Sequence, residues 1–279
     1  MMAGKRVACL ALALVVFGAT AAPAQTALLY DLMVRYGVQL PDKSFERAFD
    51  EGLTPAVPVM PGAFATALAM LSSSIGDDRI DAAYAFGILT GRSGAAASPP
   101  ELAAAGQALA QMMASGDRRS RIAGARVAGR VFASPIAPGV PGPVVPTGVT
   151  EALFSLLNAS HETELLAAMD AVGLLREYQA VASLTERYTY YRTAGKRALA
   201  GGALEALARI GDPSTTAIVQ ALVGDRWAEG RDPTALAVAF ARERMLRDGS
   251  IAIIRKALDD KSRRSQARGY LVELGAVVP

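Results

Sequence analysis

Few side chains in this sequence have the types and spacing that catalysis or metal binding requires. The chain contains one histidine, His161, and one cysteine, Cys9. A single histidine excludes a site built from several histidines, and any Ser-His-Asp arrangement has to use His161. Ser160 precedes this histidine and Glu164 follows it, as at a capped helix start, so we expect a surface histidine there. No metal ion or other cofactor is predicted.

Two pairs of neighbouring carboxylates are the next candidates for acid and base chemistry. Asp77 and Asp78 form one pair, and Asp259 and Asp260 form the other. Each pair lies where the hydrophobic pattern predicts a turn between two helices. Carboxylates at helix starts accept hydrogen bonds from free amides and complement the helix dipole, which explains both pairs without catalysis. No catalytic residue is therefore predicted.

A cluster of arginines could bind a ligand rather than transform it. Arg119, Arg126 and Arg130 fall on one face of a predicted helix. Their guanidinium groups could hold an anionic group through charge and paired hydrogen bonds. The alternative interpretation is a solvated helix face on which the arginines pair with acidic neighbours.

A cluster of tyrosines offers a second candidate surface. Tyr188, Tyr190 and Tyr191 lie close together in one predicted helix. Such rings could stack on a sugar or anchor a partner protein. The alternative is that they fill the seam between two packed helices.

The segment Ala203–Leu222 indicates what kind of element carries these residues. Its apolar residues recur at spacings of three and four, which predicts one helix, and a second helix follows Gly211, Asp212 and Pro213. Glycine can take the left-handed conformation that ends a helix, aspartate can cap the next helix, and proline suits its first turn. Neither helix can bury its apolar stripe alone.

The small residues of this segment recur along the chain, each time in a helix that follows another apolar helix. The equivalent positions are Ala82, Gly124, Ala168, Ala203 and Ala267. Their spacing is that of helical repeats, in which stacked neighbours bury what a single pair cannot. Aromatic residues make up 6% of the chain, and alanine and leucine dominate, which favours an all-α fold.

The pattern in Ala203–Pro213 resembles the HEAT-like repeats, particularly the short repeats of the phycobilisome-lyase type. In HEAT repeats an aspartate in the turn commonly pairs with a basic residue early in the second helix. The candidates here are Asp78 with Arg79, Asp117 with Arg121, and Asp260 with Arg264. The resemblance implies an α-solenoid of about six HEAT-like helix pairs, usually a binding surface and seldom an enzyme.

The same resemblance implies where a partner would bind. In the family the second helix of each pair lines the concave groove, and the positions expected to face it include Arg126, Arg130, Asp170, Glu205 and Arg209. The expected partner is another protein or peptide, with an acidic patch opposite the first two of these residues. The plainer alternative is that Glu205 and Arg209, four residues apart, form only a surface helix pair.

The chain is predicted to divide into three parts. Residues 1–24 carry two basic residues, an uncharged apolar run and small residues at the end, which predicts a secretory signal peptide; an uncleaved anchor is the alternative. Residues 25–60 are expected to form an N-terminal helical cap and a Pro-rich linker. Residues 61–279 are the expected repeat domain, with a Pro-rich crossing at 134–148 that cannot be helical.

The net charge and the predicted leader together limit the functions that the chain could have. The chain carries 29 Lys and Arg against 26 Asp and Glu, and the leader removes two of the basic residues, so a nucleic-acid partner is not expected. The leading hypothesis is a non-catalytic protein-interaction scaffold or adaptor, exported to the periplasm or cell envelope, with no membrane span after cleavage. The alternatives are an enzyme or enzyme accessory of the lyase-like HEAT class, and a binder of an anionic envelope polymer.

Overall fold

The computed structural model describes residues 22–91, 94, 96–135, 140–225 and 233–278. Within these ranges the chain is all-helical, with no β-strand, which confirms the all-α part of the predicted fold class. Its α-helices are α1 (Ala22–Arg35), α2 (Phe45–Asp50), α3 (Pro61–Ser73), α4 (Gly76–Thr90), α5 (Pro99–Met113), α6 (Arg118–Val131), α7 (Thr147–Leu156), α8 (Glu162–Leu175), α9 (Val181–Thr193), α10 (Arg197–Ile210), α11 (Thr216–Gln220), α12 (Pro233–Leu246), α13 (Ile251–Lys256) and α14 (Arg264–Glu273). Short 3-10 turns cover Pro41–Lys43, Tyr178–Ala180, Pro213–Thr215 and Ala257–Asp259.

Most of the predicted leader, residues 1–21, lies outside the described residues, and Ala22 begins α1. In the part of the chain that the structure describes, no helix combines the length and apolar character needed to cross a bilayer.

The predicted N-terminal cap contains α1 and α2, and the linker after it ends where α3 begins at Pro61. Within the Pro-rich crossing predicted at 134–148, residues 140–146 are non-helical and residues 136–139 lie outside the described ranges. Thr147 and Gly148 begin α7, so the expectation of a non-helical crossing is wrong at these two positions.

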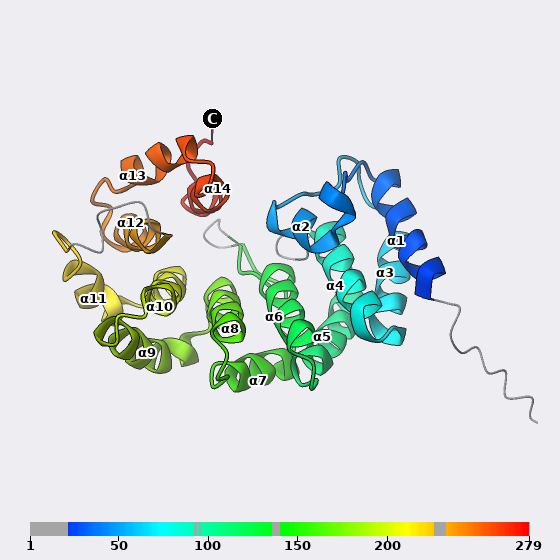
Figure 1. Cartoon of the computed structure of the whole chain (residues 1–279), viewed down its shortest axis with the longest axis horizontal. Coiled ribbons are helices and arrows are strands. Elements are labelled where there is room, and N and C mark those ends of the chain that lie inside the picture. The colour runs from blue at the N-terminus through cyan, green and yellow to red at the C-terminus, as the bar shows by residue number, and fades with distance from the viewer. Residues whose placement is uncertain (1–21, 92–93, 95, 136–139, 226–232, 279) are drawn as a thin grey trace, which may run out of the picture.

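Helices that are neighbours in sequence pack against each other from α3 onward. The contacting pairs are α3 with α4, α5 with α6, α7 with α8, α9 with α10, α11 with α12, and α13 with α14. The second helices of successive pairs also pack in series, α4 on α6, α6 on α8, α8 on α10, and α10 on α12. Figure 1 shows that these elements follow an arc, with α6, α8 and α10 on its inner side and α5, α7 and α9 on its outer side.

Small residues allow the inner helices to approach closely. A Cβ atom placed on Gly129 of α6 would lie 2.8 Å from the Cα of Ala171 in α8, and a Cβ on Gly173 of α8 would lie 2.8 Å from the Cα of Ala206 in α10. Real Cβ atoms do not come so near a backbone atom, so only glycine fits at these two positions. Ala206 is fully buried and lies against Gly173 of the neighbouring helix pair.

The turn in the middle of Ala203–Leu222 forms as its residues predict. Gly211 ends α10 in the left-handed conformation, with φ 72° and ψ 30°. Asp212 then accepts a hydrogen bond from the backbone N–H of Ser214 at 2.8 Å, and Pro213 begins a 3-10 turn that leads into α11. The local chemistry of helix stop and start therefore decides the connection without help from distant residues.

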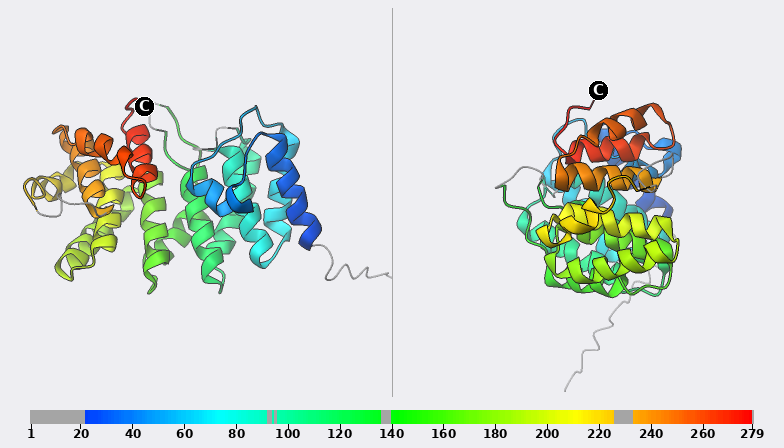
Figure 2. Two further views of the ribbon diagram at one scale, coloured as in Figure 1. Left: turned by 45° about the horizontal axis from the view of Figure 1, so that its top comes forward. Right: turned by 90° about the vertical axis from the view of Figure 1, so that its left-hand side faces the viewer.

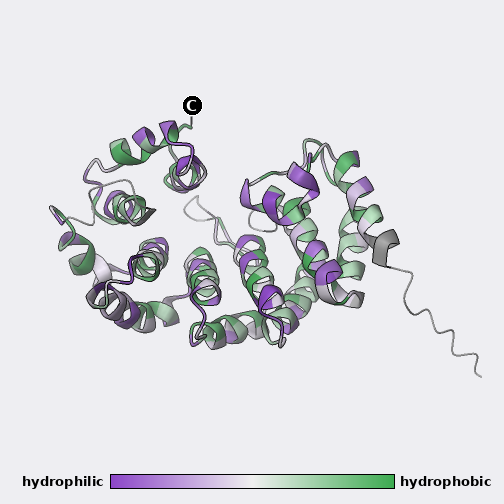
Figure 3. Ribbon diagram, in the orientation of Figure 1, coloured by the Kyte–Doolittle hydropathy of each residue, from purple (hydrophilic) through white to green (hydrophobic). Residues whose placement is uncertain are grey.

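The two ends of the chain fold back over the inner side of the arc. Near the N-terminus, α2 packs against α4, and near the C-terminus α14 follows α13 and contacts α12. Figures 1 and 2 show α2 and α14 facing each other from opposite ends of the arc. Figure 3 shows hydrophilic ribbon on both of these elements, whereas hydrophobic ribbon marks much of the helix-to-helix contact elsewhere.

Candidate binding groove

A groove of about 450 Å³ lies on the concave side of the arc. Its floor comes from α6, α8 and α10, and its walls come from α2 with the following loop and from α14. The lining residues are Phe49, Asp50, Glu51, Gly52, Thr54, Arg126, Arg130, Ala133, Asp170, Leu174, Arg209, Ser265, Arg268, Gly269, Val272 and Glu273. Four of the five positions expected to face the concave side therefore line one cavity, and the fifth, Glu205, is buried beside it.

Arg126 of α6 holds the wall formed by α2. Its guanidinium group forms an ion pair with Glu46 at 3.0 Å and another with Asp50, and it donates a hydrogen bond to the hydroxyl of Tyr84 at 3.3 Å. Glu46 also accepts a hydrogen bond from the Tyr84 hydroxyl at 3.2 Å. One arginine thus joins α6 to both α2 and α4.

Arg130, one turn later on α6, binds the end of the same wall. It donates hydrogen bonds to the backbone carbonyls of Phe49 at 2.8 Å and Leu53 at 3.2 Å, and its charge lies 4.7 Å from the centre of the Phe49 ring. Phe49 lies in the last turn of α2 and Leu53 follows the helix, so the guanidinium group lies at the C-terminal end of α2, where the helix dipole favours a cation. Arg130 therefore caps α2.

The three arginines that were expected to share one face of α6 are each paired within the chain. Arg119 forms an ion pair with Asp77 of α4 at 2.6 Å, while Arg126 and Arg130 bind α2. This is the arrangement of the alternative interpretation, in which the arginines bind acidic neighbours and carbonyls of the protein itself. The N-terminal cap occupies the face on which an acidic patch of a partner was expected.

Arg209 of α10 is the centre of a buried polar cluster that holds the other wall. It donates two hydrogen bonds to Glu273 of α14, at 2.9 and 3.0 Å, and pairs with Glu205 at 2.5 Å and with Asp170 of α8 at 2.6 Å. The Tyr270 hydroxyl of α14 donates a hydrogen bond to Glu205 at 2.7 Å. The alternative of a surface helix pair between Glu205 and Arg209 is therefore wrong, because Arg209 is buried and also binds Asp170 of α8 and Glu273 of α14.

Burial sets the protonation states in this cluster. It raises the pKa of Glu205, although the charge of Arg209 opposes the rise. Burial also acts to lower the pKa of Arg209, but the surrounding carboxylates, first Glu205 and then Glu273, keep it well above its ordinary value. Burial and the Glu205 charge raise the pKa of Tyr270, so its hydroxyl keeps the proton that it donates. Arg209 is thus a permanent cation that attaches α14 to the floor.

The middle of the floor is formed by α8. Asp170 and Leu174 occupy the positions on α8 that correspond to Arg126 and Arg130 on α6. The Asp170 side chain is 45% exposed although it pairs with Arg209. Asp170 therefore presents a carboxylate to the open part of the groove.

The predicted tyrosine cluster lies elsewhere. Tyr188 and Tyr191 are buried in the packing of α9, and the Tyr188 hydroxyl accepts a hydrogen bond from Arg192 at 2.6 Å. Tyr190 is exposed and contacts the edge of the Tyr191 ring, with centroids 5.3 Å apart. None of the three lines the groove, so the structure does not bring them together with the expected concave residues.

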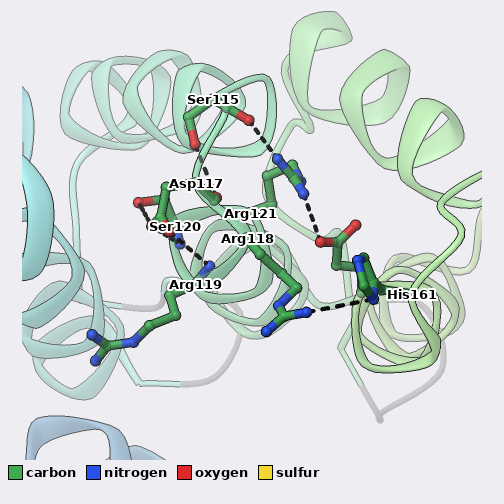
Figure 4. A network of polar contacts seen from close by, with 8 residues as sticks. Ser115, Asp117, Arg118, Arg119, Ser120, Arg121 and His161 are labelled. Atoms are coloured by element: carbon green, nitrogen blue, oxygen red, sulfur yellow. Dashed lines mark hydrogen bonds and ion pairs between the residues drawn. The ribbon is translucent and has the colours of Figure 1, made fainter.

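The start of α6 holds a separate group of charged side chains, shown in Figure 4. Asp117 caps the helix by accepting from the backbone N–H of Ser120 at 2.8 Å. Arg121 donates to the Ser115 carbonyl at 2.8 Å and pairs with buried Glu164 of α8 at 2.7 Å.

His161 lies at the edge of this group, where it is exposed immediately before α8. Arg118 points to it, with 3.4 Å between the Arg118 Nη1 and the His161 Nδ1, as Figure 4 shows. Both residues lie outside the groove lining. Within the described ranges, no group of three or more His, Cys, Asp or Glu side chains has an arrangement that could hold a metal ion.

Sequence reasoning missed the residues that α2 adds to the groove. Asp50 and Glu51 lie in the N-terminal cap, outside the repeat pattern, and no short-range spacing connects them to α6 or α14. Arg268 was also missed, although it directly follows Ala267, one of the equivalent small residues of the repeat pattern. No family model matches the chain, and a search of the curated proteins finds no match.

Proposed function

We propose that this chain is a HEAT-like α-solenoid of about six helix pairs that serves as a non-catalytic scaffold or adaptor, exported to the cell envelope, and that it holds a polypeptide segment of a partner in its concave groove. The observation that carries the proposal is the open groove of about 450 Å³ between α2 and α14. This volume falls within the range of about 300–1,000 Å³ that is common for ligand clefts.

The packing of the helix pairs supports the repeat interpretation. Second helices contact each other in series from α4 to α12, so each pair buries its apolar side against the next. Three arginines at similar places in the first, second and last helix pairs also share a role. Each donates to a carbonyl near the end of the preceding helix: Arg79 to Leu71 at 3.0 Å, Arg121 to Ser115 at 2.8 Å, and Arg264 to Leu258 at 2.7 Å. These bonds take the place of the Asp-Arg pairs that the resemblance implies.

The chemistry of the groove supports binding rather than catalysis. Arg126, Arg130 and Arg209 bind α2, Asp170 and α14, and the accessible acids are Asp50 and Glu51 at the end of α2 and Asp170 on α8. The Tyr84 and Tyr270 hydroxyls lie buried next to the floor and keep their protons, because burial and neighbouring carboxylates raise both pKa values. The arginine and tyrosine side chains nearest the groove therefore hold its walls in place.

Two tryptophan variants test the proposal. A Cβ at Gly269 in the groove, or at Gly62 in α3, would meet no atom within 4 Å, so each glycine can accept a larger side chain without a clash at the Cβ. Gly269→Trp should fill the groove and abolish capture of peptides from a random peptide library, whereas Gly62→Trp should bind as the unmodified chain does. Equal binding by both variants would place the partner site outside the groove.

The alternative in which the chain binds an anionic envelope polymer has one observation in its favour. Arg118 and Arg119 are exposed together at the start of α6, although Arg119 already pairs with Asp77. Binding of heparin as a model polyanion should then weaken steeply as salt is added and should be lost in Arg118→Glu/Arg119→Glu. Gly269→Trp should leave that binding unchanged, which separates this function from peptide binding in the groove.

A further inference from the structure

The accessible charges in the groove are mainly negative. The side chains of Asp50, Glu51 and Asp170 are 45%, 43% and 45% exposed, whereas that of Arg126 is 26% exposed and that of Arg209 is 9% exposed. Arg130 directs two nitrogens to backbone carbonyls of the α2 wall. The formal charges of the lining are balanced, but these three carboxylates are more exposed than Arg126 and Arg209, and Arg268 is the lining arginine that is exposed.

The groove also has more unused hydrogen-bond acceptors on its carboxylates than unused donors on the arginines of its floor. A carboxylate can accept about four hydrogen bonds, and the bonds described for Asp50 and Asp170 are single contacts with Arg126 and Arg209. Arg209, by contrast, directs all three of its nitrogens to the carboxylates around it. Acceptors therefore remain in the groove for an incoming donor, while most guanidinium donors of the floor are occupied.

Apolar surface lies beside these acceptors. Val272 on α14 is an exposed hydrophobic residue, and Leu174 on α8 is half-buried. Lysine and arginine side chains combine an apolar stem with a charged end, so they can cover such surface while the charge reaches a carboxylate. Arg268 is exposed on the α14 wall and would repel a cation there, which directs cationic side chains towards α2 and α8.

We propose that the groove selects a basic, extended peptide segment, whose Lys or Arg side chains lie over Leu174 and Val272 and pair with Asp50, Glu51 and Asp170. This inference rests on the proposed function, since it names the class of partner segment that the groove would take. It reverses the expectation from the sequence, because the arginines of α6 that suggested an acidic partner are occupied by the chain's own α2.

Fluorescence anisotropy of the full chain with three labelled peptides tests this inference. The probes are decapeptides that alternate alanine with lysine, glutamine or glutamate. The lysine peptide should bind about tenfold more tightly than the glutamine peptide at low salt, and added salt should reduce the difference. The glutamate peptide should bind least. Equal binding of the lysine and glutamine peptides, or a preference for the glutamate peptide, would overturn the charge selection.

Charge variants locate the effect. Glu51→Lys should weaken binding of the lysine peptide by about tenfold, since it replaces an attractive exposed pair with a repulsive one. Glu186→Lys makes the same change at an exposed position of α9, outside the groove, and this variant should bind as the unmodified chain does. Arg268→Glu should tighten binding of the lysine peptide. Equal losses in the Glu51 and Glu186 variants would show that only net charge matters and would refute the groove as the basic site.

Gly269→Trp and spermine separate the remaining outcomes. Binding of all three peptides with equal affinity, lost in Gly269→Trp, would keep the groove as a peptide site and overturn its basic specificity. If none of the three peptides binds the unmodified chain, the proposed function itself is overturned. Binding of spermine, a free polyamine, without binding of the lysine peptide would show that the carboxylates take a small cation and would refute the peptide assignment.

Discussion

Replacement of Gly173 by alanine tests the close packing of α8 against α10. A Cβ at this position would lie 2.8 Å from the Cα of Ala206 and 3.2 Å from its Cβ. Both atoms are fixed to the backbone of α10, so neither can move away by a side-chain rotation, and the two helices have to separate. Overpacking of this kind costs about 1–3 kcal/mol.

Part of that cost is offset by the helix propensity of alanine. Exchange of a glycine for alanine inside a helix contributes about 0.5–1 kcal/mol to stability. We therefore expect Gly173→Ala to lower the free energy of unfolding by about 1–2 kcal/mol. The matched control is Gly269→Ala in the interior of α14, where the new Cβ meets no atom within 4 Å. That variant should be stabilised by the helix propensity of alanine, with no cost from overpacking.

Urea unfolding followed by circular dichroism measures both variants. The midpoint should fall for Gly173→Ala and rise for Gly269→Ala, with the slope of free energy against urea unchanged in each case. The pair shares one chemical change and differs in the distance to the neighbouring helix. A Gly173 variant that is as stable as the unmodified chain would refute the close seam between α8 and α10.

Three further changes test individual contacts. Arg209→Ala leaves the carboxylates around it without their shared cation, so the free energy of unfolding should fall by about 3–5 kcal/mol, and a change below about 1 kcal/mol in urea unfolding would contradict this. Asp81→Asn should stabilise the chain near pH 7.5 and lose that advantage as the pH falls, because burial first and then Asp78 raise the pKa of Asp81 to about 6, so that its charge opposes folding above that pH. Thermal unfolding of this variant checks the sign, and an advantage that is the same near pH 4 and near pH 7.5 would be inconsistent with the raised pKa. Arg130→Ala should increase amide hydrogen exchange in α2 and leave exchange in α8 unchanged, because Arg130 caps α2; unchanged protection of α2 would contradict the capping role.

The inner packing could be predicted because it depends on short-range patterns. The spacing that made Ala203 equivalent to small residues in earlier helices also placed it on the buried side of α10. Gly211 and Asp212 likewise act through neighbouring backbone groups, so their roles follow from residue type alone. The exact positions of the close approaches, such as Gly173, followed only from the coordinates.

The walls of the groove could not be predicted in this way. Arg126 pairs with Glu46 across 80 positions of sequence, and Arg209 pairs with Glu273 across 64 positions. Repeat periodicity says which residues face the concave side, but it carries no information on what else lies there. The sequence therefore indicated that Arg126 and Arg209 face inward, and it did not indicate that α2 and α14 meet them.

The opening of the groove follows from the side-chain types at the concave positions of three inner helices. Arg126 on α6 holds α2 and Arg209 on α10 holds α14, while Asp170 on α8 faces the space between them. The same Asp170 carboxylate pairs with Arg209, so a ligand cation that binds it competes with the cluster that attaches α14. Binding in the middle of the groove and the attachment of its C-terminal wall are then thermodynamically linked, and each must weaken the other to the same extent.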